Sequence, residues 1–111
     1  MRKEYKKLVR DRIPEILHKS GLECKTVTLS KIEYQQALRR KIIEEAQEVA
    51  TANNTDLVIE IADLLEVVDA LLKSYGISHH QVGLEQDKKR ASKGDFENQT
   101  MLLWIEENNT K

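Results

Sequence analysis

Two pairs of acidic residues are the part of this sequence best suited to chemistry. Glu45 and Glu48 lie in one helical segment, and Glu60 and Asp63 lie in the next. Residues three apart are neighbours on one face of a helix, so each pair directs two carboxylates to the same side. Glu45 also falls within an apolar arc of its helix, where a carboxylate is costly unless it is neutralised or coordinated. That arc consists of Leu38, Ile42 and Val49.

Four carboxylates gathered at one place repel each other and therefore need a cation. Oxygen ligands without Cys or His favour Mg²⁺, Mn²⁺ or Ca²⁺ over zinc. Mg²⁺ keeps several waters and typically bridges to substrate phosphates, which indicates phosphoanhydride chemistry. The alternative is that the acids form a solvated helix face, and the residues by themselves leave both interpretations open.

Two long helices are expected to position these acids, at residues 31–52 and 56–76. The first begins with a capping box formed by Ser30 and Glu33. The second has Thr55 as its expected N-cap. Because the connection between them is short, the helices should pack as an antiparallel hairpin.

The hairpin predicts which acids meet. Counting outward from the connection, Glu48 lies opposite Glu60, and Glu45 lies opposite Asp63. Glu66 and Asp69 continue the spacing of three, but each step drifts by about 60° around the helix axis and carries them away from the other acids.

Shorter elements complete the expected fold. A helix at residues 14–19 begins at a proline, and another at residues 78–93 ends before Gly94. Residues 22–29 form either a connector or one short strand. The apolar run 101–105 is compatible with a strand, and its Trp104 is expected to dock on the body of the protein.

Apolar residues cover most of the circumference of the segment 57–72, which is typical of a helix buried on several sides. A domain this small can hardly surround such a helix, so we expect a partner subunit to cover part of it. The sequence predicts an all-α fold in which a helical hairpin forms the core of a bundle completed by oligomerisation, with at most one short β element.

Length and composition limit the other possibilities. The chain has 111 residues, which fits one domain spanning residues 1–111. Its net charge of -1 disfavours nucleic acid and anionic membranes as partners. A single cysteine, Cys24, is typical of the reducing cytosol, and neither a signal peptide nor a membrane span is recognisable. We therefore expect a cytoplasmic protein that binds neither nucleic acid nor membranes.

The segments KIIEEAQEV and VIEIADLLEVVDALL carry a family resemblance. They resemble the MazG-like, all-α nucleotide pyrophosphohydrolase superfamily, nearest to proteins similar to phosphoribosyl-ATP pyrophosphohydrolase. The family signature, ExxE followed by ExxD, corresponds to Glu45-x-x-Glu48 and Glu60-x-x-Asp63. The segments KLVRDRIPEIL and KKRASKGDF are also similar to recurring features of one branch, so the resemblance spans residues 7–96.

The resemblance implies a helical bundle, usually a homodimer or a dimer of dimers, that cleaves a nucleotide between its α and β phosphates. It implies Mg²⁺, or alternatively Mn²⁺, held by Glu45, Glu48, Glu60 and Asp63, with Glu45 and Glu48 also counted as catalytic. Glu44 is a further catalytic candidate that supports a ligand or orients the attacking water.

Basic residues are the candidate contacts to the substrate phosphates. Arg90 and Lys93 either reach the phosphates, as the resemblance implies, or stabilise a helix C-terminus by their charge. Lys7, Arg10 and Arg12 are further candidates for binding substrate, and the alternative is that Arg10 pairs with Asp11. Lys41 either contacts phosphate or is a structural partner of the acids.

Three functions follow from these observations. The first is a magnesium-dependent pyrophosphohydrolase of the house-cleaning type, acting on a nucleoside triphosphate. The second is a catalytically silent helical dimerisation or regulatory module. The third is phosphoribosyl-ATP pyrophosphohydrolase itself, which is disfavoured because TLSKIEYQQAL replaces the serine-tyrosine-threonine element expected before the first acidic helix.

Overall fold

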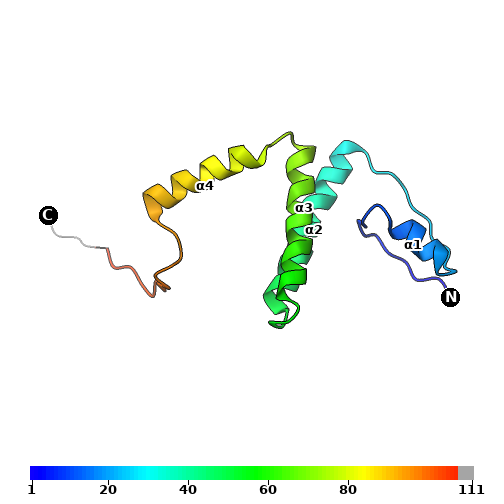
Figure 1. The fold of residues 1–111 in the computed structure, drawn as a ribbon, viewed down its shortest axis with the longest axis horizontal. Helices are drawn as coiled ribbons and strands as arrows, with labels where there is room; N and C mark the ends of the chain where they lie inside the picture. Colours follow the sequence, from blue (N-terminus) through cyan, green and yellow to red (C-terminus); the bar gives the residue numbers. More distant parts are fainter. Residues whose placement is uncertain (108–111) are drawn as a thin grey trace. The chain divides into compact units, whose positions relative to one another are not determined.

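The computed structural model describes residues 1–107 and contains four helices, shown in Figure 1. The helices are α1 (Ile13–Lys19), α2 (Lys31–Thr51), α3 (Leu57–Ser74) and α4 (His79–Lys93). No strand occurs in the described part of the chain, so the prediction of an all-α fold is confirmed. Residues 22–29 are a connector, and the run 101–105 is also irregular. The prediction of a short β element was therefore wrong. Neither segment has a neighbouring strand to supply backbone hydrogen bonds.

The chain divides into two compact units, one from Met1 to Ser78 and one that begins at His79. The first unit holds α1, α2 and α3, and the second holds α4 and the segment after it. A single domain over residues 1–111 stays a prediction, and residues 108–111 lie outside the described part.

Helix α2 begins as the sequence predicts. The Ser30 hydroxyl accepts a hydrogen bond of 3.2 Å from the Glu33 backbone N–H, and the Ser30 N–H donates to the Glu33 carboxylate at 3.1 Å. This reciprocal pair satisfies two backbone donors that would otherwise lack partners at the helix start. Hydrogen bonding by Ser30, chiefly through its backbone N–H, lowers the pKa of Glu33 from its ordinary value.

The N-cap of α3 lies one residue later than predicted. The expectation that Thr55 is the N-cap was wrong, because Asp56 occupies that position. Asn53 decides the difference, since its side-chain carbonyl oxygen accepts a hydrogen bond of 2.9 Å from the Asp56 N–H. The turn made by Asn53 thus carries the chain from α2 into α3, and the helix begins at Leu57.

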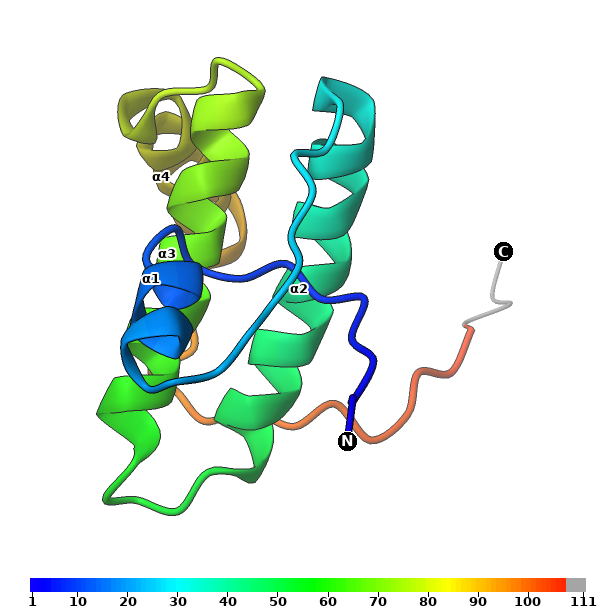
Figure 2. The same ribbon diagram turned by 90° about the vertical axis from the view of Figure 1, so that its right-hand side faces the viewer.

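Helices α2 and α3 lie side by side and run in opposite directions (Figures 1 and 2). Leu38 of α2 is the most deeply buried hydrophobic side chain among residues 1–107, at 2% exposed. Further along the same stripe of α2, Ile42, Glu45 and Val49 are half-buried at intervals of three and four residues. The predicted helical hairpin is confirmed, and Glu45 lies on its packed face.

The ends of the hairpin that lie away from the α2–α3 connection are joined by polar contacts. The Gln35 side-chain amide donates to the Ser74 backbone carbonyl at 3.2 Å. The Arg39 guanidinium donates to the Tyr75 hydroxyl at 3.1 Å and lies 5.2 Å from the centre of its ring. These contacts fix how α2 and α3 are aligned along their length.

The N-terminal segment and α1 belong to the same compact unit as the hairpin. Pro14 stands in the first turn of α1, as its missing N–H and fixed φ favour. Gly21 follows the helix with a φ of +79°, a conformation that other residues rarely adopt. Before α1, residues 8–12 line a pocket together with side chains of α2 and α3.

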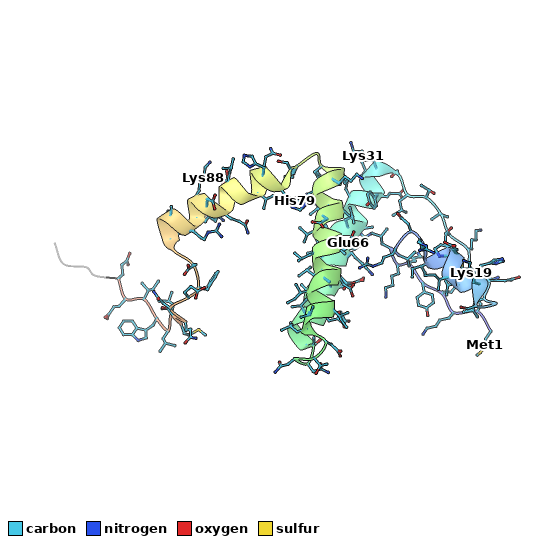
Figure 3. All side chains as sticks on the ribbon, viewed as in Figure 1. Met1, Lys19, Lys31, Glu66, His79 and Lys88 are labelled. Atoms are coloured by element: carbon cyan, nitrogen blue, oxygen red, sulfur yellow. The ribbon has the colours of Figure 1, made fainter. Side chains whose placement is uncertain are left out.

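Helix α4 carries a run of charged residues that pair within the helix. Lys88, labelled in Figure 3, pairs with Glu85 at 3.2 Å, and Arg90 pairs with Asp87 at 2.6 Å. Gly94 ends the helix with a φ of +83°. Within residues 1–107, no helix combines the length and the apolar character that crossing a membrane requires.

Candidate metal and nucleotide site

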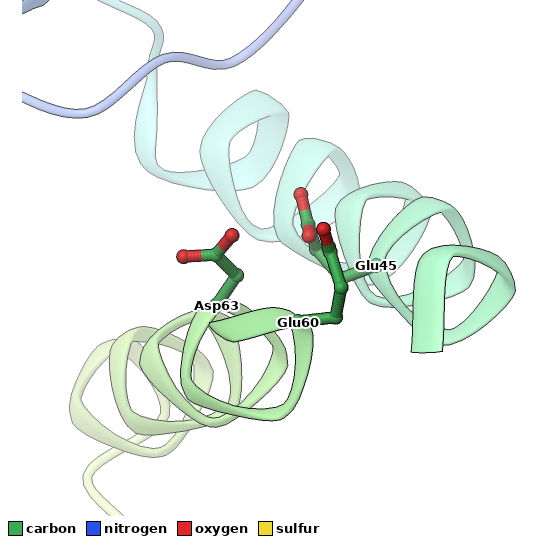
Figure 4. Close-up of side chains that lie close together, drawn as sticks. All are labelled: Glu45, Glu60 and Asp63. Atoms are coloured by element: carbon green, nitrogen blue, oxygen red, sulfur yellow. The ribbon is translucent and has the colours of Figure 1, made fainter. Parts of the chain in front are cut away.

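Three carboxylates from the two arms of the hairpin converge between α2 and α3. Glu45 of α2 and Glu60 and Asp63 of α3 each offer an oxygen, and these oxygens lie within 4.8 Å of one another. Figure 4 shows the three side chains projecting into the space between the helices. We call these three residues the acidic cluster. All three are half-buried, and the Glu45 side chain is only 15% exposed.

The electrostatics of the acidic cluster are unfavourable without a counter-charge. The pKa of Glu60 is raised, first by desolvation in the space between the helices and then by the negative charges of Glu48, Asp63 and Glu45. Glu60 has no ion-pair partner among residues 1–107. Its carboxylate is therefore held among like charges, which is the arrangement that a bound cation relieves.

Glu48 lies beside the acidic cluster but is not one of its three members. Glu48 is an exposed residue of α2. It is nevertheless close enough to Glu60 to be the largest of the charges that raise the pKa of Glu60. Three of the four predicted metal ligands thus converge, and the metal-binding role of Glu48 stays a prediction.

Lys41 is placed one turn before Glu45 and pairs with two acids. Its ammonium lies 3.7 Å from a Glu45 oxygen and 3.5 Å from a Glu44 oxygen. The lysine side chain is largely buried, whereas Glu44 is exposed. This geometry matches the interpretation of Lys41 as a structural partner of the acids, and its contact to phosphate stays a prediction.

Arg10 does not pair with Asp11, the alternative that the sequence leaves open. Its guanidinium instead donates a hydrogen bond of 2.9 Å to an oxygen of Asp63, a member of the acidic cluster. The two residues are 53 positions apart in the chain. No local pattern in the sequence indicates this pair, because it depends on the path of the N-terminal segment over the hairpin.

A pocket of about 520 Å³ adjoins the acidic cluster. The N-terminal segment, α2 and α3 each contribute to its wall, and Arg10, Glu45 and Asp63 are among the lining residues. Most of the other lining residues could not be predicted from the sequence. The exception is the N-terminal segment, where the charge density of LVRDRIP indicated a functional role. The lining residues that were not predicted as site residues are Leu8, Val9, Asp11, Tyr34, Leu38, Glu66, Val67 and Ala70.

Two predicted substrate contacts lie in the second unit. Arg90 and Lys93 stand in the last turn of α4, and Arg90 is engaged with Asp87. The same positions fit the alternative interpretation, in which basic residues stabilise the C-terminus of a helix. Their contact to substrate phosphates stays a prediction.

The donor atoms of the acidic cluster suit a hard divalent cation. The cluster consists of carboxylate oxygens without nitrogen or sulfur, the set that Mg²⁺ and Mn²⁺ accept and that does not select zinc. Three carboxylates on two rigid helices leave positions free for water or phosphate oxygens. Glu45, Glu60 and Asp63 can therefore hold such an ion.

Comparisons with known proteins add one relative. A segment of 53 residues is 45% identical to an uncharacterized protein of Mycolicibacterium smegmatis, and the match covers 48% of this chain and 54% of that protein. This chain thus spans about half the length of that relative. No protein-family profile and no solved structure match the chain. Because the relative is itself uncharacterized, it assigns no activity to this chain.

Proposed function

We propose that this chain is a magnesium-dependent nucleotide pyrophosphohydrolase. It cleaves the anhydride between the α and β phosphates of a nucleoside triphosphate and releases a monophosphate and pyrophosphate. The observation that carries the proposal is the convergence of Glu45, Glu60 and Asp63 from two helices, with their oxygens within 4.8 Å of one another. The resemblance of ExxE and ExxD to the MazG-like superfamily supports the same reaction.

The acidic cluster holds the metal ion in this proposal, with Glu48 at its edge. When bound, Mg²⁺ neutralises phosphate charge and lowers the pKa of the attacking water. Lys41 pairs with Glu44 and Glu45 and so keeps both carboxylates oriented during the reaction. Lys41 also offsets part of the negative charge of the cluster.

A carboxylate next to the acidic cluster takes the proton of the attacking water. The candidates are Glu44 and Glu48, which are exposed and lie one turn apart on α2. The water oxygen forms a bond to phosphorus, the bond to the bridging oxygen breaks, and pyrophosphate leaves with the electron pair. The proton moves to a glutamate oxygen and then to solvent.

The adjoining pocket is where we place the rest of the nucleotide. Its volume of about 520 Å³ is within the range of small-molecule sites. Leu8, Val67 and Tyr34 supply apolar and aromatic surface for a base or sugar, and Arg10 and Arg12 supply positive charge for phosphates. A cytoplasmic location follows from the same proposal, because nucleoside triphosphates are substrates of the cytosol.

We also propose that the protein acts as a homodimer or a dimer of dimers. The helix α3 supports this, because Val58, Ile61 and Leu65 share one face and are all exposed. A second copy that covers this face would complete the bundle. Analytical ultracentrifugation of the wild-type protein tests the assignment, and a monomer at all concentrations would contradict it.

The activity is tested with a panel of nucleoside triphosphates and phosphoribosyl-ATP in Mg²⁺, with pyrophosphate release as the measurement. We expect turnover of at least one triphosphate, and Asp63→Asn should lower the rate by about 100-fold or more because a metal ligand is lost. Glu48→Gln should also lower the rate. Asp69→Asn is the matched control on α3, since Asp69 is exposed and outside the acidic cluster, and it should leave the rate within about twofold.

The exposed apolar face of α3 also favours a second candidate function, a helical dimerisation or regulatory module without turnover. The same panel separates the two. No pyrophosphate release from any substrate, or unchanged rates in Asp63→Asn and Glu48→Gln, would sink the catalytic proposal. A stable dimer without turnover would then support the module, and turnover of phosphoribosyl-ATP alone would support the biosynthetic enzyme.

A further inference from the structure

We propose that Arg10 acts as a counter-ion of the acidic cluster, is displaced when a divalent cation binds, and then contacts the phosphates of the substrate. The proposal rests on the function proposed above and deepens it by assigning one residue two successive partners. Arg10 belongs to the N-terminal segment and not to either metal-binding helix.

The contact of Arg10 with the acidic cluster is direct. The guanidinium donates to an Asp63 oxygen at 2.9 Å, across 53 positions of the chain. The backbone of Arg10 is held at the start of α1, because its carbonyl accepts a hydrogen bond of 3.1 Å from the Ile13 N–H. The Arg10 side chain can therefore change its conformation while its backbone stays in place, and it is 60% exposed.

The charges around the cluster are only partly balanced by the chain. Lys41 pairs with Glu45, and Arg10 pairs with Asp63. Glu60 has no ion-pair partner among residues 1–107, and Glu48 adds a further negative charge nearby. The cluster therefore still attracts a cation although Arg10 already occupies one of its carboxylates.

A divalent cation and the Arg10 guanidinium compete for this place. Two positive centres bonded to one carboxylate repel each other at a separation of a few ångström. The pair of Arg10 with Asp63 is weak, because water reaches both side chains, which are 60% and 41% exposed. An ion held by all three carboxylates displaces it, and Asp63 changes partner from guanidinium to metal.

The released guanidinium already lies at the wall of the nucleotide pocket. Arg10 lines this pocket beside Arg12, within reach of the cluster that holds the metal. A planar guanidinium suits phosphate oxygens, which it binds through two parallel hydrogen bonds. The exchange therefore couples metal binding to the creation of a phosphate contact.

Mn²⁺ binding to the full chain without nucleotide tests the exchange, followed by electron paramagnetic resonance. The variant Arg10→Gln should bind Mn²⁺ roughly two- to fivefold more tightly than the wild type, because a weak competitor is removed. The variant Arg12→Gln is the matched control. It removes the same charge from the pocket wall, but Arg12 pairs with Glu15 and not with the cluster, so its Mn²⁺ affinity should change less.

Substrate binding should respond in the opposite direction. With Mg²⁺ present, Arg10→Gln should raise the KM for the triphosphate by roughly tenfold, because a charged phosphate contact is lost. A merely structural role of Arg10 would weaken metal and substrate binding together. Arg10→Lys keeps the charge without the planar group, and its Mn²⁺ affinity should fall between those of the wild type and Arg10→Gln.

Each outcome decides between the two proposals. If neither the wild type nor Arg10→Gln binds Mn²⁺, the metal site and this inference both fail. Equal or weaker Mn²⁺ binding by a folded Arg10→Gln variant, with normal binding by the wild type, overturns the exchange alone. Far-ultraviolet circular dichroism reports whether Arg10→Gln is folded. If Arg10→Gln is unfolded, Arg10→Lys takes its place, and a Mn²⁺ affinity of Arg10→Lys equal to that of the wild type overturns the exchange.

Discussion

The α2–α3 hairpin has two halves that differ in how their side chains interact. One half lies away from the α2–α3 connection, and the other lies near it. Away from the connection, Gln35 donates to the Ser74 carbonyl and Arg39 donates to the Tyr75 hydroxyl. Near the connection, the acidic cluster places Glu45 opposite the two carboxylates of α3. Complementary groups join the first half, whereas like charges face each other in the second.

This contrast indicates that the repelling carboxylates of the acidic cluster lie in the half of the hairpin on which its stability depends less. Hydrogen bonds at the distal half and the packing of Leu38 hold the helices together, so the acids need not contribute to stability. Functional sites commonly retain groups that lower the stability of the unliganded protein. The acidic half is therefore expected to gain stability when its charge is removed, and the distal half to lose it when its contacts are removed.

Replacing Leu38 should have the largest effect on stability. Leu38→Ala removes the most deeply buried side chain and should lower the free energy of unfolding by about 2–3 kcal/mol, near the low end for leucine because a pocket adjoins it. Urea unfolding followed by circular dichroism measures the change. The control Leu22→Ala, at an exposed position of the connector, should change it by less than about 0.5 kcal/mol. Equal losses in the two variants would contradict the role of Leu38 as the anchor of the hairpin.

The two halves should respond with opposite signs to removal of a polar group. Gln35→Ala should destabilise the protein by about 1 kcal/mol, because the Ser74 carbonyl loses its donor in a partly buried place. Glu60→Gln should instead stabilise the metal-free protein, because repulsion among the acids decreases. Thermal unfolding in the presence of a chelator measures both, with Gln36→Ala, an exposed neighbour, as the control. A destabilised Glu60→Gln variant would show that the contrast between the halves is wrong.

The smallest effects should be seen in the pH dependence of stability. The folded-state pKa of Glu60 is raised, so the folded state binds its proton more tightly and this group favours folding more as the pH falls through that pKa. The folded-state pKa of Glu33 is lowered, so its contribution is present above the unfolded-state pKa and is lost as the pH falls.

Comparing variants isolates the two contributions. Without metal, Glu60→Gln should lose the gain on acidification above about pH 4.5, and Glu33→Gln should lose the decline below about pH 4.5. Chemical unfolding at several pH values measures each slope. Slopes that change in the same direction in both variants would contradict the assignment of opposite roles.

Much of the hairpin was predictable because its signals are local. Ser30 and Glu33 are three residues apart, and a capping box needs only that spacing and the start of a helix. The placement of Glu45 opposite Asp63 followed from a short connection and the rise of a helix. The prediction for Thr55 was wrong because Asn53, two residues earlier, formed a competing local hydrogen bond.

The sequence by itself determined the helices, their antiparallel packing and the approach of Glu45 to Asp63, because periodicity and caps act over a few residues. Only the tertiary structure decided that Arg10 reaches Asp63, that Glu48 lies outside the acidic cluster, and that residues 8–12 close a pocket beside it. These features depend on how a segment 53 positions away crosses the hairpin and on individual side-chain directions. The spacing of residues within a helix encodes neither the path of the N-terminal segment nor the direction of an individual side chain.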